Sequence, residues 1–485
     1  MESTDVAAPT AGHYRQQLDR TLKVFANVTL TFGTLGPTAT VFAFLPVVLW
    51  VAGSFAFIGF LIAAVFALCQ GLVYSELGTA YPVAGGEYSM VGRVLGRPVG
   101  AALFAIMIAN YILVPSAFAL AGGIYLGVIW PWAGTHSQLV GALIVLFAAG
   151  VAFLRISVGW VVAAIFLGVE LVAIPVLVVL GLVHAHSPVD RLFTAHLYGP
   201  DGPMKLTATA FLLGITIAFF CYQGFGNAVI FSEETKHAKQ RVGRAVMWTL
   251  LISVIAIATP AAAVLLGAPS LKGLFTAQAP LTYVLESLGG HNLDTVVSLF
   301  VFFAIVDAEI ASVMAFGRVL WSSGRDNAWP GPISRALATV HPKLETPYVA
   351  TSVLAAAIMI LTLVSTIAAV VTFSGVVTLA FAGLMGLSAI VIRFKKSAPT
   401  DRYRLPLWPL PPAVLLVGCV VMATQQKMSD LWITLAIAGG FFIYYLVYLL
   451  PRSDTHFVLL DSPEEMPDAG EVAAPAIALV EPGEA

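Results

Sequence analysis

The chain has 485 residues, of which 59% are hydrophobic and 10% charged, with a formal net charge of −2 at pH 7. Soluble domains carry roughly a quarter charged residues, so lipid is expected around most of this chain. The near-neutral charge gives no indication of a nucleic-acid partner. Cys69, Cys221 and Cys419 lie in separate apolar runs, which argues against a disulfide framework or a zinc site, and no cofactor is expected. The composition therefore predicts an all-α integral membrane protein.

The first twenty-two residues are polar and contain Asp5, Arg15 and Arg20, unlike a cleavable signal peptide. A cytosolic N-terminus is expected. A spanning helix needs about 20 mostly apolar residues, and this criterion predicts twelve spans. Their expected limits are 23–46, 52–78, 97–129, 138–154, 158–183, 206–231, 245–267, 293–321, 348–364, 367–393, 407–423 and 431–450.

The basic residues give an independent test of this topology, because Lys and Arg concentrate in cytoplasmic loops. With a cytosolic N-terminus, only Arg191, Lys205, Lys272 and Lys427 of the 24 basic residues fall on the outer side. A missed span would invert every later loop, so this asymmetry supports both the count and the orientation. Residues 453–485, rich in Pro, Glu, Asp and Ala, predict a disordered cytosolic tail.

Two spans contain residues that interrupt a helix at membrane depth. The first has Gly33, Gly36 and Pro37, and the sixth has Gly224 and Gly226, about 190 residues later. Backbone can leave helical geometry there only if protein or a wet cavity satisfies its polar groups. Close helix packing is the alternative explanation of any single membrane glycine.

The matching offset predicts two five-helix repeats, 23–185 and 206–393, with helices 11 and 12 appended at 407–450. Each repeat has an odd number of spans, so the second must be inverted. Broken helices at matching places in inverted halves indicate a transport site near the bilayer midplane. The N-terminus of an outer half-helix favours anions, and the C-terminus of the half before it favours cations.

Three motifs resemble those of amino acid/polyamine/organocation permeases. The first is "YSELGTAYPVAGGEYSMVGRVLG" at 74–96, with its acidic residue Glu76, Pro82, paired glycines and Tyr88. The second is the stretch around Gly224 followed by "EETK". The third is "GRVLWSSGRDNAWP" at 317–330, followed by "HPKLETP".

The resemblance covers spans one to ten and implies alternating access, with the carboxylate and ammonium of a substrate held where helices one and six unwind. By position, it implies two sets of lining residues. They are Gly33, Thr34, Gly36 and Thr38 on the carboxylate side, and Cys221, Tyr222, Gly224 and Gly226 on the side of helix six.

This sequence departs from the family pattern at two places. Pro37 replaces a residue with a free N–H, which makes an amine or a modified amino acid more plausible as substrate. The fifth span contains Glu170 but no lysine resembling the tethered sodium replacement of some members. The fifth span therefore gives no basis for assuming proton coupling through such a lysine.

Ionisable residues within spans are functional candidates because burying them in lipid is costly. Glu170 in span five and Asp307 and Glu309 in span eight qualify. Asp307 has small one-turn neighbours that leave room for a ligand, so it is the candidate for binding the ammonium or a proton. Glu309 and Glu170 are candidates for coupling, and a hydrogen-bonded tie between helices is the alternative for all three.

Glu233 and Glu234 follow a helix C-terminus, where negative charge is unfavourable. Compensation by Arg93, Arg97 or Arg325 would form an inner-gate ion-pair network, and a solvated loop is the alternative.

Two aromatic residues flank the break in the sixth span. Tyr222 and Phe225 could close over a substrate as gates, or could be ordinary packing.

Together these features favour a secondary active transporter of amino acids or related amines in the cytoplasmic membrane, with a coupling proton or sodium ion, and not an enzyme. A polyamine or organic-cation carrier and an amino acid/amine exchanger of the same fold are alternatives, as is a receptor that binds such ligands without translocating them. No Gly-rich phosphate-binding motif is present, which argues against an ATP-driven pump.

Overall fold

A computed structural model describes residues 22–83, 85–154, 168, 172–185, 187–199, 201–396, 399, 402–457 and 459. The described chain is almost entirely helical, as expected. Its two strands form one short antiparallel hairpin, in which Leu197 pairs with Met204. The expected N-terminal segment and most of the expected C-terminal tail lie outside the described residues.

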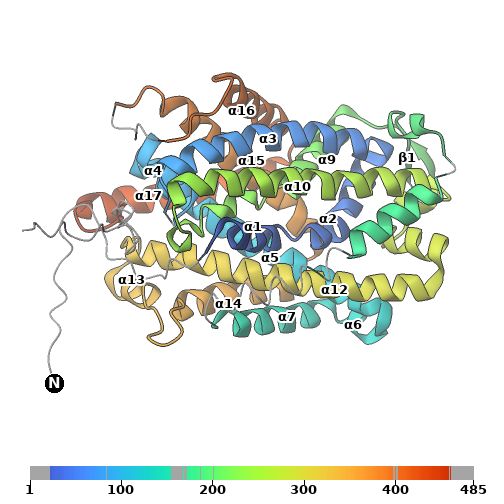
Figure 1. The fold of residues 1–485 in the computed structure, drawn as a ribbon, viewed down its shortest axis with the longest axis horizontal. Helices are drawn as coiled ribbons and strands as arrows, with labels where there is room; N and C mark the ends of the chain where they lie inside the picture. The colour runs from blue at the N-terminus through green and yellow to red at the C-terminus, as the bar shows by residue number, and fades with distance from the viewer. Residues whose placement is uncertain are drawn as a thin grey trace, which may run out of the picture.

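The first half of the described chain contains seven α-helices labelled in Figure 1, one further helix at Val172–Val183, two 3-10 turns and the hairpin. Their bounds are α1 Val24–Leu35, α2 Pro37–Ala52, η1 Gly53–Phe55, α3 Ala56–Ala80, α4 Glu87–Leu95, α5 Arg97–Ile129, α6 Pro131–Thr135, α7 Ser137–Ala152, η2 Val189–Leu192, β1 Leu197–Gly199 and β2 Gly202–Met204.

The second half begins at the end of the hairpin and is again helical. Its elements are α9 Ala208–Cys221, η3 Phe225–Ala228, η4 Ser232–Glu234, α10 Ala238–Gly267, α11 Leu271–Thr276, α12 Pro280–Arg325, α13 Gly331–Leu337, α14 Tyr348–Val364, α15 Ile367–Val391, α16 Leu410–Ala423, α17 Met428–Tyr444, η5 Tyr445–Leu449 and η6 Leu450–Arg452.

Seven helical stretches of the described chain are long and apolar enough to cross a membrane. One of them, Val24–Ala80, contains both α1–α2 and α3. Four further apolar helices are shorter: Ser137–Ala152, Val172–Val183, Tyr348–Val364 and Leu410–Ala423. The chain is thus a multi-pass membrane protein.

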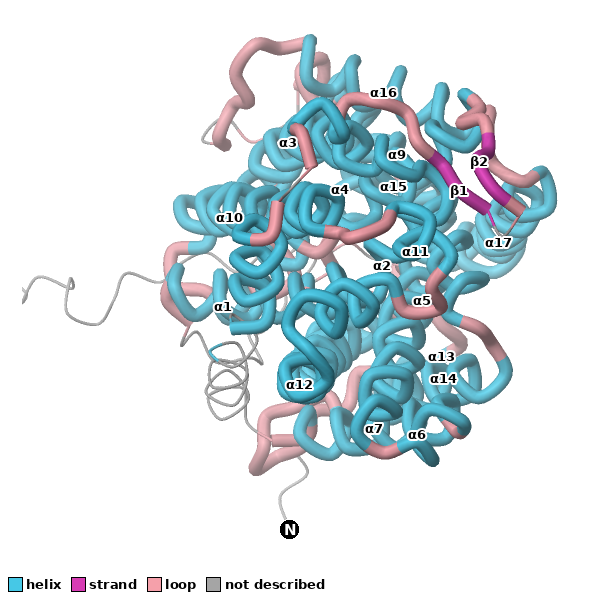
Figure 2. Tube along the Cα trace, turned by 90° about the vertical axis from the view of Figure 1, so that its right-hand side faces the viewer, coloured by secondary structure: helices cyan, strands magenta, loops and turns pink. Residues whose placement is uncertain are grey.

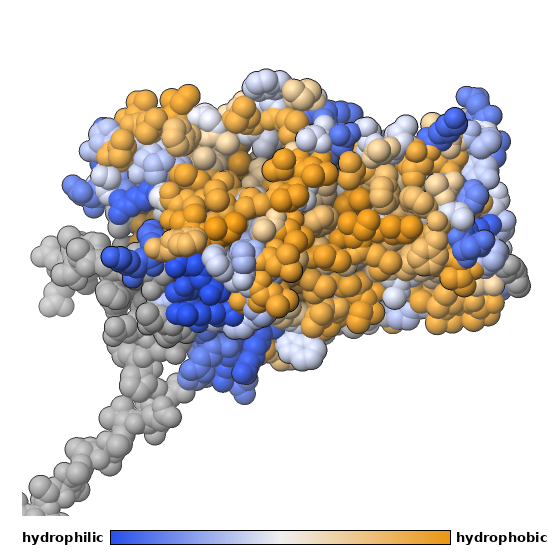
Figure 3. All heavy atoms as spheres, turned by 90° about the horizontal axis from the view of Figure 1, so that it is seen from above, coloured by the Kyte–Doolittle hydropathy of each residue, from blue (hydrophilic) through white to orange (hydrophobic). Residues whose placement is uncertain are grey.

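The outer surface of the bundle is apolar, the reverse of a soluble protein. Phe147 on α7 is 55% exposed and Val420 on α16 is 63% exposed. In Figure 3, hydrophobic side chains cover the middle of the visible face, while hydrophilic ones gather toward the two ends. Lipid can contact such a surface at no cost, which explains why these helices are apolar on nearly every side.

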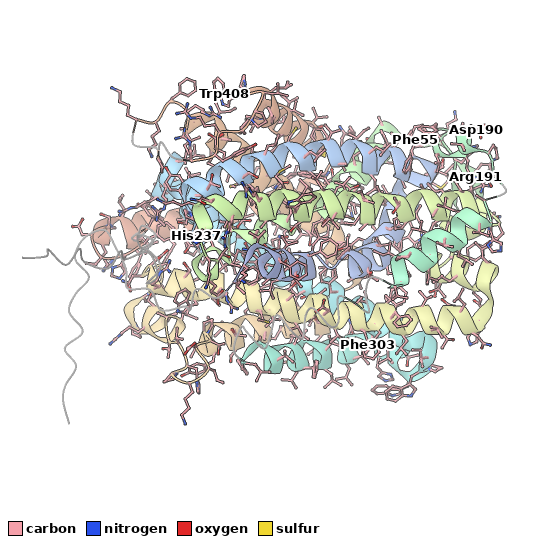
Figure 4. The ribbon with its side chains drawn as sticks, viewed as in Figure 1. Phe55, Asp190, Arg191, His237, Phe303 and Trp408 are labelled. Carbon is pink, nitrogen blue, oxygen red and sulfur yellow. The ribbon has the colours of Figure 1, made fainter. Side chains whose placement is uncertain are left out.

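The two ends of the bundle differ in the segments that they carry. In Figure 4, His237 and Trp408 lie toward one end, whereas Phe55, Asp190 and Arg191 lie at the other. The β1–β2 hairpin belongs to the second end (Figure 1), which we call the hairpin end. Figure 2 views the bundle from the hairpin end and shows the hairpin at its margin.

Several helix limits differ from those expected. Helix α12 is longer than the expected span 293–321, since it starts at Pro280 and continues past a kink at Gly290, where φ is 78°. The segment expected to be a loop after span two contains the buried helix α4. Of the expected fifth span, the structure describes Gly168 and the residues from Val172 onward, and Val172–Val183 is a helix.

Candidate functional site

The first helix break lies between α1 and α2. Gly36 adopts φ 51° and ψ 68°, the left-handed region, and its N–H closes the last turn of α1 on the Phe32 carbonyl. Pro37 then starts α2, where a missing N–H has no cost. The Thr40 hydroxyl donates to the Leu35 carbonyl at 2.7 Å, which satisfies one of the carbonyls that the break releases. The positive end of α2 is therefore placed inside the protein.

The second break follows α9. The helix ends at Cys221, Gly224 has φ 121°, and the chain continues through the 3-10 turns η3 and η4. Gly226 has no positive φ, but a Cβ at this position would collide with the Tyr74 ring of α3. The two glycines therefore serve different needs: Gly224 permits the backbone turn, and Gly226 permits close packing.

The two breaks contact each other directly. A Cβ on Gly224 would lie 2.9 Å from the Leu35 Cα. The Asn227 amide donates to the Thr34 hydroxyl at 2.9 Å. Closer to the start of α1, the Asn27 amide donates to the Ala228 carbonyl at 3.1 Å. Polar backbone and side-chain groups released by the breaks are thus gathered at one place in an apolar bundle.

A small cavity of about 50 Å³ lies at this place. A water molecule needs roughly 10–15 Å³ of such volume, so there is room for a few waters. Its polar lining comes from α1, α2, α5 and the second break: Thr34, Thr40, Asn110, Gln223 and Asn227.

Aromatic rings close the cavity toward the hairpin end. Phe44 of α2 stacks on Phe118 of α5, with ring centroids 5.2 Å apart, and packs against Phe220 of α9 at 5.1 Å. All three rings line the cavity. Phe118 lies seven residues further along α5 than Tyr111, which lines the same cavity, so the lining extends by about 10 Å along the bundle axis.

A carboxylate lies at the other end of the cavity. Glu87, the first residue of α4, is 6% exposed. It accepts hydrogen bonds from the Tyr74 hydroxyl at 2.8 Å on Oε1 and from the Tyr111 hydroxyl at 3.1 Å on Oε2. Burial raises the pKa of the Glu87 carboxyl, and the two hydroxyl donors partly oppose this by stabilising the charged form.

The residues expected to line the site fall into two groups. Thr34, Cys221, Gly224 and Gly226 line the cavity. The other group lies behind the lining and packs against neighbouring helices: Gly33, Gly36, Thr38, Tyr222 and Asp307.

Helix α12 packs against the first break on the side away from the cavity. A Cβ on Gly33 would lie 3.7 Å from Asp307 Oδ2 and 3.3 Å from Ala311, so Asp307 faces α1. Gly36 lies against Ala308. Tyr222 points away from the cavity, and its hydroxyl donates to the Phe60 carbonyl at 3.3 Å.

The acidic candidates within the spans occupy different surroundings. Asp307 and Glu309 are both fully buried in α12. Glu309 shares a helix face with Ile305, which lies beside Gly122, and with Phe316, which stacks on Tyr111. It therefore faces α5, whereas Asp307 faces α1. Glu170 lies outside the described residues.

A buried ion pair lies at the end of the bundle opposite the hairpin. Arg318 of α12 binds Glu234 of η4 through two hydrogen bonds, 2.9 Å from Nε and 3.2 Å from an Nη, and both side chains are buried. The sequence analysis instead named Arg93, Arg97 or Arg325 as the residue that compensates the charge of Glu234. The Arg93 guanidinium lies over the Tyr81 ring at 5.4 Å. The Glu233 side chain is outside the described residues.

The aromatic residue Phe225, a candidate for gating, is buried and packs edge-on against Tyr74.

Sequence reasoning missed Glu87, Tyr111 and Arg318. Glu87 lies within the quoted motif, directly after the paired glycines, but the motif drew attention to Glu76. Glu76 is instead bound by Arg393 at 2.9 Å and Arg402 at 3.3 Å, away from the cavity. An acid that starts a short helix in apolar surroundings, and an arginine within an apolar helix, were the available signals.

Comparison with known proteins shows the family to which the chain belongs. A family profile described as "Amino acid permease" matches residues 22–450. An uncharacterized transporter of Mycobacterium tuberculosis is 28% identical over 429 residues, which cover 87% of this chain and 90% of that protein. The branched-chain amino acid permease BcaP of Bacillus subtilis is 23% identical, with 92% and 94% covered. The serine/threonine exchanger SteT of the same species is 24% identical, with 77% and 83% covered. The profile and these relatives, all transporters by name, confirm the resemblance seen in the motifs, and the chain belongs to the amino acid permease family.

Proposed function

We propose that this protein is a secondary active transporter that binds a neutral amino acid between its two helix breaks and moves it across the cytoplasmic membrane by alternating access. The observation that carries the proposal is the polar cavity at the contact of the two breaks. The first turn of α2 offers a positive helix end to a carboxylate, and the carbonyl end of α9 offers a negative one to an ammonium group. A zwitterion matches both.

The architecture proposed for this function has twelve spans, with repeats at 23–185 and 206–393 in inverted orientation and two further helices at 407–450. In its support, the two breaks lie about 190 residues apart in sequence and meet in space. The N- and C-termini are proposed to be cytosolic. Segments expected inside, such as that of His237, lie at the end opposite the hairpin, which carries segments expected outside.

Alternating access requires the cavity to open at one end at a time. A volume of about 50 Å³ is too small for an amino acid. Displacement of Phe44, Phe118 and Phe220 would open it toward the hairpin end. Opposite them, rearrangement around the Arg318–Glu234 pair would open it toward the cytosol.

The cavity lining supports a substrate with an apolar or small polar side chain. Phe44, Phe118, Val114 and Phe316 contribute apolar surface, and the lining includes no Lys or Arg among the described residues. BcaP and SteT are named for branched-chain amino acids and for serine and threonine, respectively. An amine carrier is the second candidate, favoured by the carboxylate of Glu87 and by Pro37, which has no N–H to offer a carboxylate.

Ligand-dependent thermal stabilisation separates these candidates. The purified protein is heated with leucine and its decarboxylated amine, 3-methylbutylamine, and with serine and 2-aminoethanol. A ligand that binds only the folded state at 100 times its Kd stabilises it by about 2.7 kcal/mol. We expect the amino acids to raise the Tm and the amines to leave it unchanged. Stabilisation by the amines alone would contradict the proposal.

Flux in proteoliposomes then separates a transporter from a receptor. We expect radiolabelled leucine to accumulate in vesicles preloaded with unlabelled leucine, by counterflow. Binding without counterflow would identify a receptor.

A threonine pair tests whether the first break binds the ligand. Thr40 donates across the break to the Leu35 carbonyl at 2.7 Å. Thr372, which is partly exposed on α15 and away from the cavity, donates to the Ala368 carbonyl at 2.9 Å. Thr40→Val frees the Leu35 carbonyl beside the cavity, and we expect leucine affinity to fall roughly tenfold, as for one lost hydrogen bond. Thr372→Val is the matched control, and equal effects of the two variants would argue against the site.

A further inference from the structure

Glu87 is the one carboxylate among the described residues that line the cavity, and none of those lining residues is Lys, Arg or His. A zwitterionic substrate adds no net charge. The ionised carboxyl therefore needs a cation from elsewhere whenever the cavity is closed from water, because an uncompensated buried charge is costly. A proton is the smallest cation that meets this need.

The charges on the surrounding elements are engaged in other contacts. Glu76 of α3 binds Arg393 and Arg402. Arg97 of α5 donates to the Ser453 carbonyl at 2.7 Å, and Arg93 of α4 lies over Tyr81. The groups that face Glu87 are the hydroxyls of Tyr74 and Tyr111.

Each tyrosine links Glu87 to a different moving part of the site. Tyr74 packs edge-on against Phe225, at 5.6 Å between centroids, and its ring fills the space that Gly226 leaves at the second break. Tyr111 stacks on Phe316 of α12, with centroids 4.0 Å apart and planes inclined by 12°. The ionised carboxylate thereby holds α3, α5 and the second break together at the cytosolic end of the cavity.

We propose that Glu87 carries the coupling proton of transport, a role that rests on the function proposed above. Binding of one proton forms an O–H bond on one carboxylate oxygen and neutralises the group. The protonated oxygen becomes a weaker acceptor, because the hydrogen bond to it is no longer assisted by a negative charge. The hydrogen bond from one tyrosine hydroxyl therefore weakens, and the link to its neighbouring element loosens. Release of the proton on the other side restores both hydrogen bonds.

The experiment measures leucine uptake into proteoliposomes with and without an inward proton gradient, beside counterflow at equal pH. For the unaltered protein we expect the gradient to raise uptake about tenfold. Glu87→Gln keeps the shape and stays neutral, so we expect its uptake to be the same with and without the gradient, at whatever rate of counterflow the variant has. Glu286→Gln, at an exposed glutamate of α12, is the control and should keep both the counterflow and the stimulation of the unaltered protein.

The possible results have distinct meanings. Glu87→Gln that still responds to the gradient overturns the proposal, as does an unaltered protein whose counterflow is normal but whose uptake ignores the gradient. Absence of counterflow in the unaltered protein instead refutes the proposed function itself. A folded Glu87→Gln protein that no longer binds leucine would show that Glu87 contacts the substrate, which also overturns a purely coupling role.

Tyr111→Phe gives a second readout that does not depend on the glutamine variant. Loss of a hydroxyl donor disfavours the charged carboxylate, so the pH of half-maximal uptake should rise by about one unit, the size expected for one hydrogen bond to a charged group. Tyr125→Phe is the matched control, because its hydroxyl donates to the Phe42 carbonyl and not to Glu87. An unchanged pH profile in Tyr111→Phe would overturn the proposal.

Discussion

At the residue scale, the second break depends on glycines that no other residue can replace without strain. Gly224 has φ 121° and lies against the Leu35 backbone, so even a methyl group is opposed both by the backbone conformation and by the lack of space. The lack of a side chain at Gly224 therefore permits both the break after α9 and the close contact of this break with α1.

Gly224→Ala should abolish leucine-dependent stabilisation, because the contact that shapes the cavity must open to admit the Cβ. Gly150→Ala on α7 is the matched control, since a Cβ there meets nothing within 4 Å and its φ is ordinary. Thermal melts with and without leucine make the comparison. Normal leucine binding by Gly224→Ala would refute the role of this break.

The carboxyl of Glu87 also predicts a pH dependence of stability. Its pKa is raised in the folded state, so the folded protein binds this proton more tightly than the unfolded chain does. The contribution to stability is therefore greatest at low pH and is lost as the pH rises from the ordinary glutamate pKa through the raised one. Only the unaltered protein loses this contribution, so we expect the Tm of Glu87→Gln to rise relative to that of the unaltered protein as the pH increases over this interval. A difference in Tm that stays constant with pH would contradict the assignment.

At the element scale, buried ion pairs join segments that are distant in the sequence. Arg318 and Glu234 connect α12 with η4, and Glu76 connects α3 with the segment that follows α15. Removing one partner of a buried pair leaves an unpaired charge, whereas removing both does not.

Arg318→Met should therefore destabilise the protein by about 3–5 kcal/mol, and Arg318→Met with Glu234→Met should recover much of that loss. The measurement is a double-mutant cycle of thermal stability in detergent. If the effects of the two single variants simply add, Arg318 and Glu234 are not coupled and the pair is not a structural tie.

Features that depend on neighbouring residues in the sequence were predictable, and those that depend on distant ones were not. Apolar runs gave the helices, and Gly36 with Pro37 gave the first break, because helix length and helix breaking are local properties. The contact of Glu87 with Tyr111 and that of Glu234 with Arg318 arise from packing between elements, which no local pattern encodes.

At the scale of the whole molecule, the proposed topology places the hairpin end outside the cell. Lys272 on α11 and Lys343, between α13 and α14, are both exposed and fall on opposite sides in this topology. A membrane-impermeant maleimide added to intact cells should label Lys272→Cys and leave Lys343→Cys unlabelled until the cells are opened. Labelling in the reverse order would invert the proposed orientation.

The start of α1 is joined to the second break by backbone hydrogen bonds. The Leu22 N–H donates to the Glu234 carbonyl at 2.8 Å, and the Lys236 N–H donates to the Leu22 carbonyl at 2.9 Å. These two hydrogen bonds connect the segment before α1 to the segment after η3, outside the lining of the cavity. In the proposed transport cycle, we therefore expect the end of α1 that carries Leu22 and the segment around Glu234 to move together. A crosslink between them should be tolerated by this cycle, whereas a crosslink from either of them to α12 should arrest it.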